Sequence, residues 1–152
     1  MRLTRQTNYA IRLLMYCAAN SGRLSRVAEV ATAYNVSELF LFKILQPLVE
    51  NGLVETVRGR NGGVRLARPA ADISLFDVVR VTEESFVMAE CFESDIIDCP
   101  LVDSCGTNAT LRKALNAFFD VLANYSIADA VKARPNINAT LGIREVAQLA
   151  PH

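Results

Sequence analysis

The sequence lacks the features that mark most enzymes, secreted proteins and membrane proteins. Its 152 residues contain no tryptophan and a single histidine, at position 152. No apolar run approaches the roughly 18 residues that a membrane span needs, and the first residues contain no apolar signal-peptide core. The chain has no nucleophile–base pairing and no G-x-x-x-x-G-K phosphate loop. We therefore expect a cytoplasmic protein that is not an enzyme, takes no small-molecule substrate and does not bind a membrane.

The formal net charge is zero, but the charges of opposite sign are separated along the chain. Residues 1–68 contain ten Arg or Lys and four Glu, a net charge of +6. Residues 69–152 contain six basic and twelve acidic residues, a net charge of −6. This separation indicates two different roles in one chain. The basic half can meet a polyanion, which the acidic half cannot do.

Apolar periodicity predicts two helices at the start of the basic half. The first covers residues 7–20, with Thr7 as its N-cap and one apolar face. Cys17 lies on that face and is expected to pack in the core, because a free cysteine behaves as a small hydrophobic residue. The second helix covers residues 25–34, with Ser25 as its N-cap.

A third helix and a hairpin complete a winged helix-turn-helix. Ser37 should cap a helix that ends at Asn51-Gly52, and Pro47 should kink or split it because proline removes one backbone donor. Residues 53–66 contain two β-compatible runs around a glycine-rich basic turn, which predicts a hairpin. This order of elements is typical of proteins that bind double-stranded DNA. The predicted fold is mainly α-helical, with a small β-hairpin wing.

Two groups of side chains are candidates for contact with a DNA operator. Residues near the start of the third helix can reach base edges in a major groove, and the hairpin tip can enter a minor groove or contact phosphates. Alternatively, the arginines only solvate a surface. Because Phe40 and Phe42 are more apolar than a groove face requires, we expect one of them to pack inside. The candidates are Ser37, Glu38, Leu39, Phe42 and Lys43 on the helix and Arg58, Gly59, Arg60, Asn61 and Gly62 at the tip.

The acidic half predicts a linker helix over 74–84 and a long helix over 107–125. Ser74 and Ser126 each precede an aspartate by three residues, which indicates a capping box at the start of the linker helix and of a short helix after the long one. The apolar spacing of the long helix predicts a dimerisation seam. Its residues are Leu111, Leu115, Phe118, Leu122 and Tyr125. We divide the chain into a DNA-binding domain at 1–68, a linker, cysteine loop and dimerisation helix at 69–134, and a weakly patterned, mobile tail at 135–152.

Three cysteines, Cys91, Cys99 and Cys105, form a C-x7-C-x5-C pattern before the long helix. Thiolates are soft ligands that suit iron–sulfur clusters, zinc or copper, but zinc sites usually use closer pairs and four ligands. Three thiolates can hold three irons of a [4Fe–4S] cluster. Redox-active thiols without metal and incidental cysteines are the alternatives. Nearby carboxylates would destabilise an anionic cluster, which favours a sensor over an electron carrier. They are Glu90, Glu93, Asp95, Asp98 and Asp103.

The opening MRLTRQTNYAIRLL, the stretch LVETVRGRNGGVRLARP and the cysteine loop together resemble the winged-helix iron–sulfur regulators typified by IscR and NsrR. The resemblance covers roughly residues 1–130. It implies a homodimer in which each long helix packs on its mate, with one [4Fe–4S] cluster per subunit and [2Fe–2S] as a degradation form. The long first gap, in ECFESD…DCPLVDSCG, resembles an iron-regulating branch. That branch represses iron-uptake genes while the cluster is intact.

Two positions depart from the family pattern. Asn108 stands where the IscR branch has a histidine three residues after the last cysteine, and Asn8 stands where the NsrR branch has an aspartate that reaches the partner's cluster. These departures favour an iron sensor over a dedicated nitric-oxide sensor. The alternatives are a nitric-oxide or redox-sensing regulator of the same family, and an iron–sulfur electron-transfer or scaffold protein, which would have no use for a basic wing.

Overall fold

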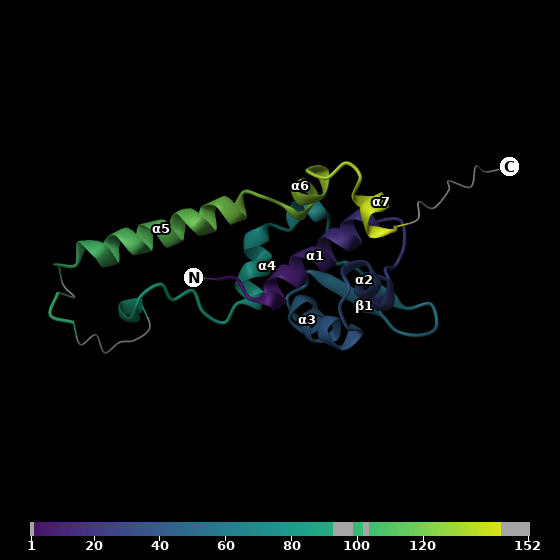
Figure 1. Ribbon diagram of the computed structural model, residues 1–152, viewed down its shortest axis with the longest axis horizontal. Coiled ribbons are helices and arrows are strands. Elements are labelled where there is room, and N and C mark those ends of the chain that lie inside the picture. Colours follow the sequence, from purple (N-terminus) through teal and green to yellow (C-terminus); the bar gives the residue numbers. More distant parts are fainter. Residues whose placement is uncertain (1, 93–98, 102–103, 144–152) are drawn as a thin grey trace.

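The computed structural model describes residues 2–92, 99–101 and 104–143. The chain forms a compact winged body from which one long helix projects (Figure 1). The body contains helices α1 (Arg5–Ala19), α2 (Val27–Tyr34), α3 (Glu38–Glu50) and α4 (Leu75–Thr82), the strands β1 (Val54–Val57) and β2 (Gly63–Leu66), and the short turn η1 (Ala70–Asp72). The projecting part contains η2 (Glu90–Phe92) and α5 (Gly106–Ala123), and α6 (Ile127–Lys132) and α7 (Ile137–Leu141) lead back to the body. This mainly helical fold with a hairpin wing confirms the predicted fold class.

Helix α1 is the centre of the body, because α3, α4, α6, α7 and β2 all contact it. Its apolar face is buried by the i, i+3, i+4 spacing of residues such as Ala10, Leu13 and Leu14. Helix α3 contributes Leu41, Ile44 and Leu48 to the same core. Helix α3, which we call the recognition helix after its predicted role, is therefore fixed on its inner face, and its outer face is left to solvent.

The cap predicted for α1 is wrong by one turn. Thr4, not Thr7, is the N-cap, and its hydroxyl accepts a hydrogen bond from the backbone N–H of Thr7 at 3.2 Å. The Thr7 hydroxyl lies instead 2.8 Å from the Thr82 hydroxyl, in a buried contact between α1 and α4. The Thr7 side chain, predicted to cap α1, therefore makes a tertiary hydrogen bond instead.

The cap predicted for α2 is also wrong, because Ser25 belongs to the sheet edge. Ser25 pairs with Val64 through two backbone hydrogen bonds of 2.9 and 2.8 Å, beside the antiparallel pair β1–β2. Its hydroxyl accepts a hydrogen bond from the amide of Asn20. Helix α2 begins two residues later, where the Glu29 carboxylate accepts from the backbone N–H of Arg26.

Pro47 does not split α3, contrary to one of the two outcomes expected for it. The helix is continuous from Glu38 to Glu50, and Ser37 caps it as predicted, accepting from the backbone N–H of Phe40 at 3.2 Å. Pro47 lies in the last turn, where it removes a single intrahelical bond. The adjacent Leu48 is fully buried, so packing holds this turn against the body.

Helix α5 packs on α4 through a cluster of phenylalanines. Phe119 of α5 lies with its ring centroid 5.1 Å from that of Phe76 in α4 and 4.8 Å from that of Phe86. Phe86 belongs to the segment that leaves α4 and runs outward below α5 in the view of Figure 1. Both predicted capping boxes are present, Ser74 with Asp77 on α4 and Ser126 with Asp129 on α6. The linker helix α4 contacts α1 and α3 of the winged body.

The weakly patterned tail contains one more helix. Helix α7 contacts α1, and Ile143 after it is buried in the core. The first part of the tail, to residue 143, therefore packs on the body. Residues 144–152 lie outside the described part of the chain, and the predicted mobility of the tail stays a prediction. No helix among the described residues combines the length and apolar character that crossing a membrane requires.

Candidate nucleic-acid interface and cysteine site

The outer face of α3 presents the side chains that the sequence predicts for DNA contact. Ser37, Glu38 and Lys43 are exposed, and so are Leu39 and Phe42, at 69% and 53% exposure. Large apolar side chains at this level of exposure are available to touch thymine methyl groups.

Phe40 is the aromatic residue that packs inward. Its ring meets that of Tyr9 edge-to-face, with 5.4 Å between the centroids, and the Arg5 guanidinium lies 5.0 Å from the Phe40 centroid. This contact resolves the predicted conflict between Phe40 and Phe42. It also fixes the start of α3 against α1.

The hairpin tip joins β1 to β2 in a turn that depends on glycine. Gly59 has φ +108°, and a Cβ on Gly62 would collide with the carbonyl oxygen of Val57 and lie 2.9 Å from that of Gly59. Arg60 and Asn61, between these glycines, and Arg58, just before Gly59, are exposed. In the described residues, neither tip arginine has a carboxylate within 4.0 Å, so both charges are free to meet phosphates.

A groove of about 710 Å³ lies between α3 and the hairpin. Phe42, Arg58, Gly59, Arg60 and Gly62 line it, so the structure brings predicted residues of both groups to one surface. Arg26 and Gln46 line it as well, and the sequence prediction missed them. Gln46 is four residues after Phe42 on the same helix face, a spacing that would have found it. Arg26 precedes α2 and enters the groove only through the tertiary fold.

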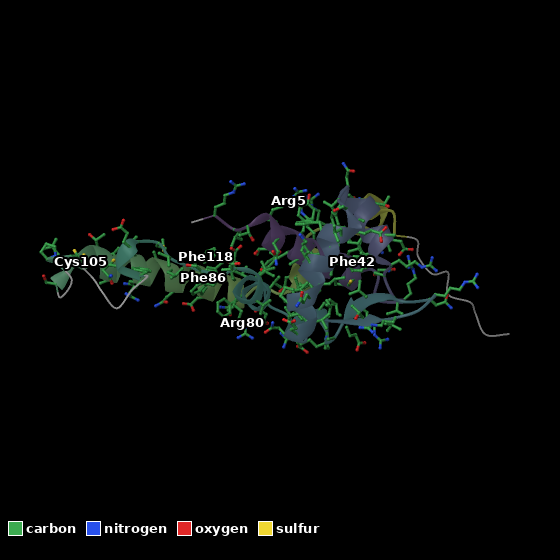
Figure 2. The ribbon with its side chains drawn as sticks, turned by 90° about the horizontal axis from the view of Figure 1, so that it is seen from below. Arg5, Phe42, Arg80, Phe86, Cys105 and Phe118 are labelled. Carbon is green, nitrogen blue, oxygen red and sulfur yellow. The ribbon has the colours of Figure 1, made fainter. Side chains whose placement is uncertain are left out.

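The cysteine site lies at the end of α5 that is far from the recognition helix. Figure 2 shows Cys105 at this end and Phe42 on the winged body. Cys105 is the N-cap of α5, and its sulfur accepts from the backbone N–H of Asn108 at 3.4 Å. The amide nitrogen of Asn108 donates to the sulfur of Cys91 at 3.0 Å. Cys91 and Cys105 therefore converge on one residue of α5.

Arg112 and Phe92, which the sequence prediction missed, make further contacts around Asn108 and Cys91. The Nε of Arg112 donates to Oδ1 of Asn108 at 2.8 Å, and the Arg112 guanidinium lies 4.5 Å from the ring centroid of Phe92. The i, i+4 spacing of Asn108 and Arg112 is visible in the sequence as a local helix pair. The contact between Arg112 and Phe92 cannot be seen in the sequence, because it joins α5 to η2 across the loop.

The donor set suits an iron–sulfur cluster by its chemistry, since thiolates are the ligands these clusters use. Two of the three thiols, Cys91 and Cys105, are brought together, while Cys99 is exposed. Among residues 2–92, 99–101 and 104–143, no three potential ligands lie close enough together to hold a metal ion. Four of the five predicted carboxylates lie outside the described residues: Glu93, Asp95, Asp98 and Asp103.

Cys17 is separate from this site. Its side chain is 4% exposed in the core of the body, as predicted, and burial raises the pKa of its thiol to about 12. A protonated buried thiol is a poor nucleophile and a poor metal ligand. The candidate metal ligands are therefore the loop cysteines, none of which is buried.

The predicted dimerisation seam is incompletely covered within one chain. Leu111, Leu115, Phe118 and Leu122 are half-buried, and Tyr125 is exposed. No residue of α5 is fully buried. Val121, one position from the seam, is 69% exposed. An 18-residue helix of this kind retains apolar surface that a partner could cover.

Comparison with known proteins identifies the family to which this winged body belongs. Residues 3–133 match the Rrf2 family, described as iron-dependent transcriptional regulators. The chain is a member of the Rrf2 family. It is 74% identical over 145 residues to Protein aau3 of Rhizobium meliloti (strain 1021), covering 95% of this chain and 94% of that protein. It is 38% identical over 146 residues to the HTH-type transcriptional regulator NsrR of Bacillus subtilis (strain 168), covering 95% of this chain and 100% of that protein.

Solved structures of similar fold include other regulators. CymR, the global cysteine regulator of B. subtilis, matches with a TM-score of 0.72 at 20% identity over 88% of this chain and 98% of that one. IscR of T. potens matches with a TM-score of 0.70 at 24% identity, over 100% of this chain and 94% of that one. These likenesses show the winged-helix fold. The family match and the identity to NsrR make this Rrf2 protein a DNA-binding transcriptional regulator related to NsrR.

Proposed function

We propose that this Rrf2 protein is a repressor of iron-uptake genes, resembling RirA, the rhizobial iron regulator. It would act as a homodimer on a double-stranded DNA operator. Cys91, Cys99 and Cys105 would hold one labile [4Fe–4S] cluster per subunit, with [2Fe–2S] as a degradation form. When bound, the cluster makes the state of the loop depend on iron supply and on oxygen.

The convergence of Cys91 and Cys105 at the start of α5 carries the proposal. Cys105 caps α5, and Cys91 of η2 is hydrogen-bonded to Asn108 of the same helix. Helix α5 packs, through Phe119, against α4 of the winged body. Helix α4 in turn contacts α3, whose outer face is the candidate DNA surface. A change in the order of the loop can therefore alter the position of the recognition helix by way of α5 and α4.

The DNA contact is assigned to the groove between α3 and the hairpin. From the start of α3, Glu38 would accept a hydrogen bond from cytosine. Ser37 and Lys43 would donate to guanine or to a phosphate, with Leu39 beside them. Arg58, Arg60 and Asn61 would meet phosphates or a minor groove from the tip. In a dimer closed by the α5 seam, two such surfaces would lie about 34 Å apart on one side of the duplex.

Iron content and operator binding test the cluster. Purification without oxygen should give a brown protein with about four irons per chain, and a chelator should lower its operator affinity. Changing Cys91, Cys99 or Cys105 to Ala should abolish the iron spectrum and weaken operator binding, whereas Cys17→Ala should leave both intact. A colourless wild-type protein, or a cysteine variant that binds the operator as tightly as the iron-loaded protein, would contradict the proposal.

Salt dependence tests the DNA surface separately. If roughly six phosphates are neutralised per dimer, log K should fall with log salt at a slope of about −5. Replacing Arg60 by Ala should make that slope shallower by about one unit for each phosphate that the arginine no longer neutralises. A flat salt response would exclude the basic half as the contact surface.

A second candidate is a regulator of the same family that senses nitric oxide or redox state. The 38% identity to NsrR of B. subtilis favours it. The iron proposal is preferred because Asn8 stands where the NsrR resemblance implies a ligating aspartate. Comparing loss of operator binding under a chelator with loss under nitric oxide, at equal cluster concentration, distinguishes the two.

A further inference from the structure

We propose that Asn108 and Arg112 are positioning residues that hold Cys91 beside Cys105 before iron and sulfide bind. The inference rests on the proposed cluster site and adds residues that are not cluster ligands. Together with Phe92, these two residues form a clasp between η2 and α5. We call Phe92, Asn108 and Arg112 the loop clasp.

Asn108 contacts both thiols, but with different groups. Its backbone N–H donates to the sulfur of Cys105, which is fixed in place as the cap of α5. Its side-chain nitrogen donates to the sulfur of Cys91, which lies on the other side of the loop. One residue therefore joins the end of the loop to its beginning, although the two cysteines are far apart in the sequence.

Arg112 decides which way the Asn108 amide points. An arginine side chain has only hydrogen-bond donors, so the atom of Asn108 that faces Nε of Arg112, at 2.8 Å, has to be the oxygen. The amide nitrogen is then directed to the sulfur of Cys91. Without Arg112 the amide could turn over and present its oxygen to that sulfur, which would remove the donated hydrogen bond.

Phe92 completes the clasp because it is the neighbour of Cys91. The Arg112 guanidinium lies over the Phe92 ring at 4.5 Å from the centroid, within the roughly 6 Å at which a cation–π contact is favourable. The contacts therefore close a ring through Cys91, Phe92, Arg112 and Asn108. Lysine cannot replace Arg112, because it lacks the planar guanidinium that stacks and donates from Nε at the same time.

The test uses the full chain without iron, in a Cys99→Ala background, and a dibromobimane cross-linker that fluoresces when it bridges two nearby thiols. Cys17 is buried and does not compete. Asn108→Asp retains the size of the side chain and its acceptor for Arg112, but loses the donor to Cys91. We expect its cross-link yield to fall roughly three- to tenfold, the effect of losing one such hydrogen bond. Asn116→Asp, which adds the same charge at an exposed position of α5, should cross-link like the parent.

Arg112→Lys provides a second variant that conserves charge. We expect it to lower the cross-link yield like Asn108→Asp, whereas Lys113→Ala, at an exposed neighbouring position, should not. The iron-loaded forms give an independent measurement. Asn108→Asp and Arg112→Lys should lose iron to a chelator several-fold faster than wild type and should change the visible circular dichroism of the cluster.

The outcomes separate the clasp from the proposed function. If the wild-type chain holds no iron but Asn108→Asp still loses the Cys91–Cys105 cross-link, the clasp is supported and the cluster proposal fails. If Asn108→Asp and Arg112→Lys both cross-link like the parent, the clasp is overturned whatever the iron content.

Discussion

Phe119 offers the most direct test of how α5 and the loop are held on the winged body. Its ring meets Phe76 of α4 at 5.1 Å and Phe86 of the following segment at 4.8 Å, so one side chain joins three parts of the chain. Replacing a fully buried phenylalanine by alanine costs about 3–5 kcal/mol. Phe119 is half-buried, which reduces this to about 2 kcal/mol, and each aromatic pair that is removed adds about 0.5–1.5 kcal/mol. We expect Phe119→Ala to cost about 3 kcal/mol.

Urea unfolding at a fixed protein concentration measures this cost, since a dimer's apparent stability depends on concentration. Hydrogen exchange of the peptide covering residues 83–92 should rise as well, because that segment no longer packs on α5. The matched control is Phe118→Ala, which removes the same atoms from the neighbouring position. Phe118 contacts Phe119 at 5.8 Å and lies on the predicted seam, so the effect of its removal should depend on protein concentration. Equal effects of the two variants, or a cost below about 0.5 kcal/mol for Phe119→Ala, would refute this packing argument.

Three other changes probe the wing, the seam and a cap. Gly62→Ala places a Cβ against the Val57 carbonyl, so it should distort the hairpin tip at a cost of about 1–3 kcal/mol in stability. A gel-shift assay should show operator binding weakened at least tenfold. Gly22→Ala is the control, because the space around Gly22 is open. Leu115→Glu should give monomers in light scattering, whereas the exposed Ala114→Glu should not; a dimeric Leu115→Glu would exclude the seam. Hydrogen bonds from Ser126 lower the pKa of Asp129, so its cap is formed above about pH 4 and is lost as the pH falls through the lowered pKa. Far-ultraviolet circular dichroism should show a smaller loss of helix between pH 4 and 2 in Asp129→Asn, and an unchanged acid transition would count against the cap.

The elements that the sequence predicted correctly are those whose signals are local. Ser37, Ser74 and Ser126 each cap the helix that follows them, and a cap needs only the next three residues. Thr7 and Ser25 have the same local signal but serve other partners. Thr7 meets Thr82 across the core and Ser25 pairs with Val64. Tertiary contacts of this kind cannot be read from a window of a few residues.

In the candidate site too, the features with local signals were predictable and those that depend on tertiary contacts were not. The exposed tip Arg58-Gly59-Arg60 was predictable because a glycine-rich turn between two β runs has a sequence signature. In the sequence, Asn108 is notable only as a departure from the family pattern, although its side chain contacts Cys91. That contact depends on where the chain on the other side of the loop returns to α5. The role of Arg112 depends on the contact between Asn108 and Cys91, because this arginine acts through the Asn108 amide.

The distance between the cysteine end of α5 and the recognition helix leaves two routes by which the loop can affect DNA binding (Figure 2). One runs within a chain, from α5 through Phe119 and Phe76 to α4 and then α3. The other runs through a partner that packs on the seam. Phe119→Ala breaks the first route directly and keeps the side chains of Cys91, Cys105 and every predicted seam residue. In the seam, only Phe118 loses a contact, the one with Phe119. If the first route operates, the iron-loaded Phe119→Ala protein should retain its iron and its dimer but bind the operator several-fold more weakly, and chelation should lower its affinity less than that of wild type. Full operator affinity and an undiminished response to the chelator would assign the coupling to the partner instead.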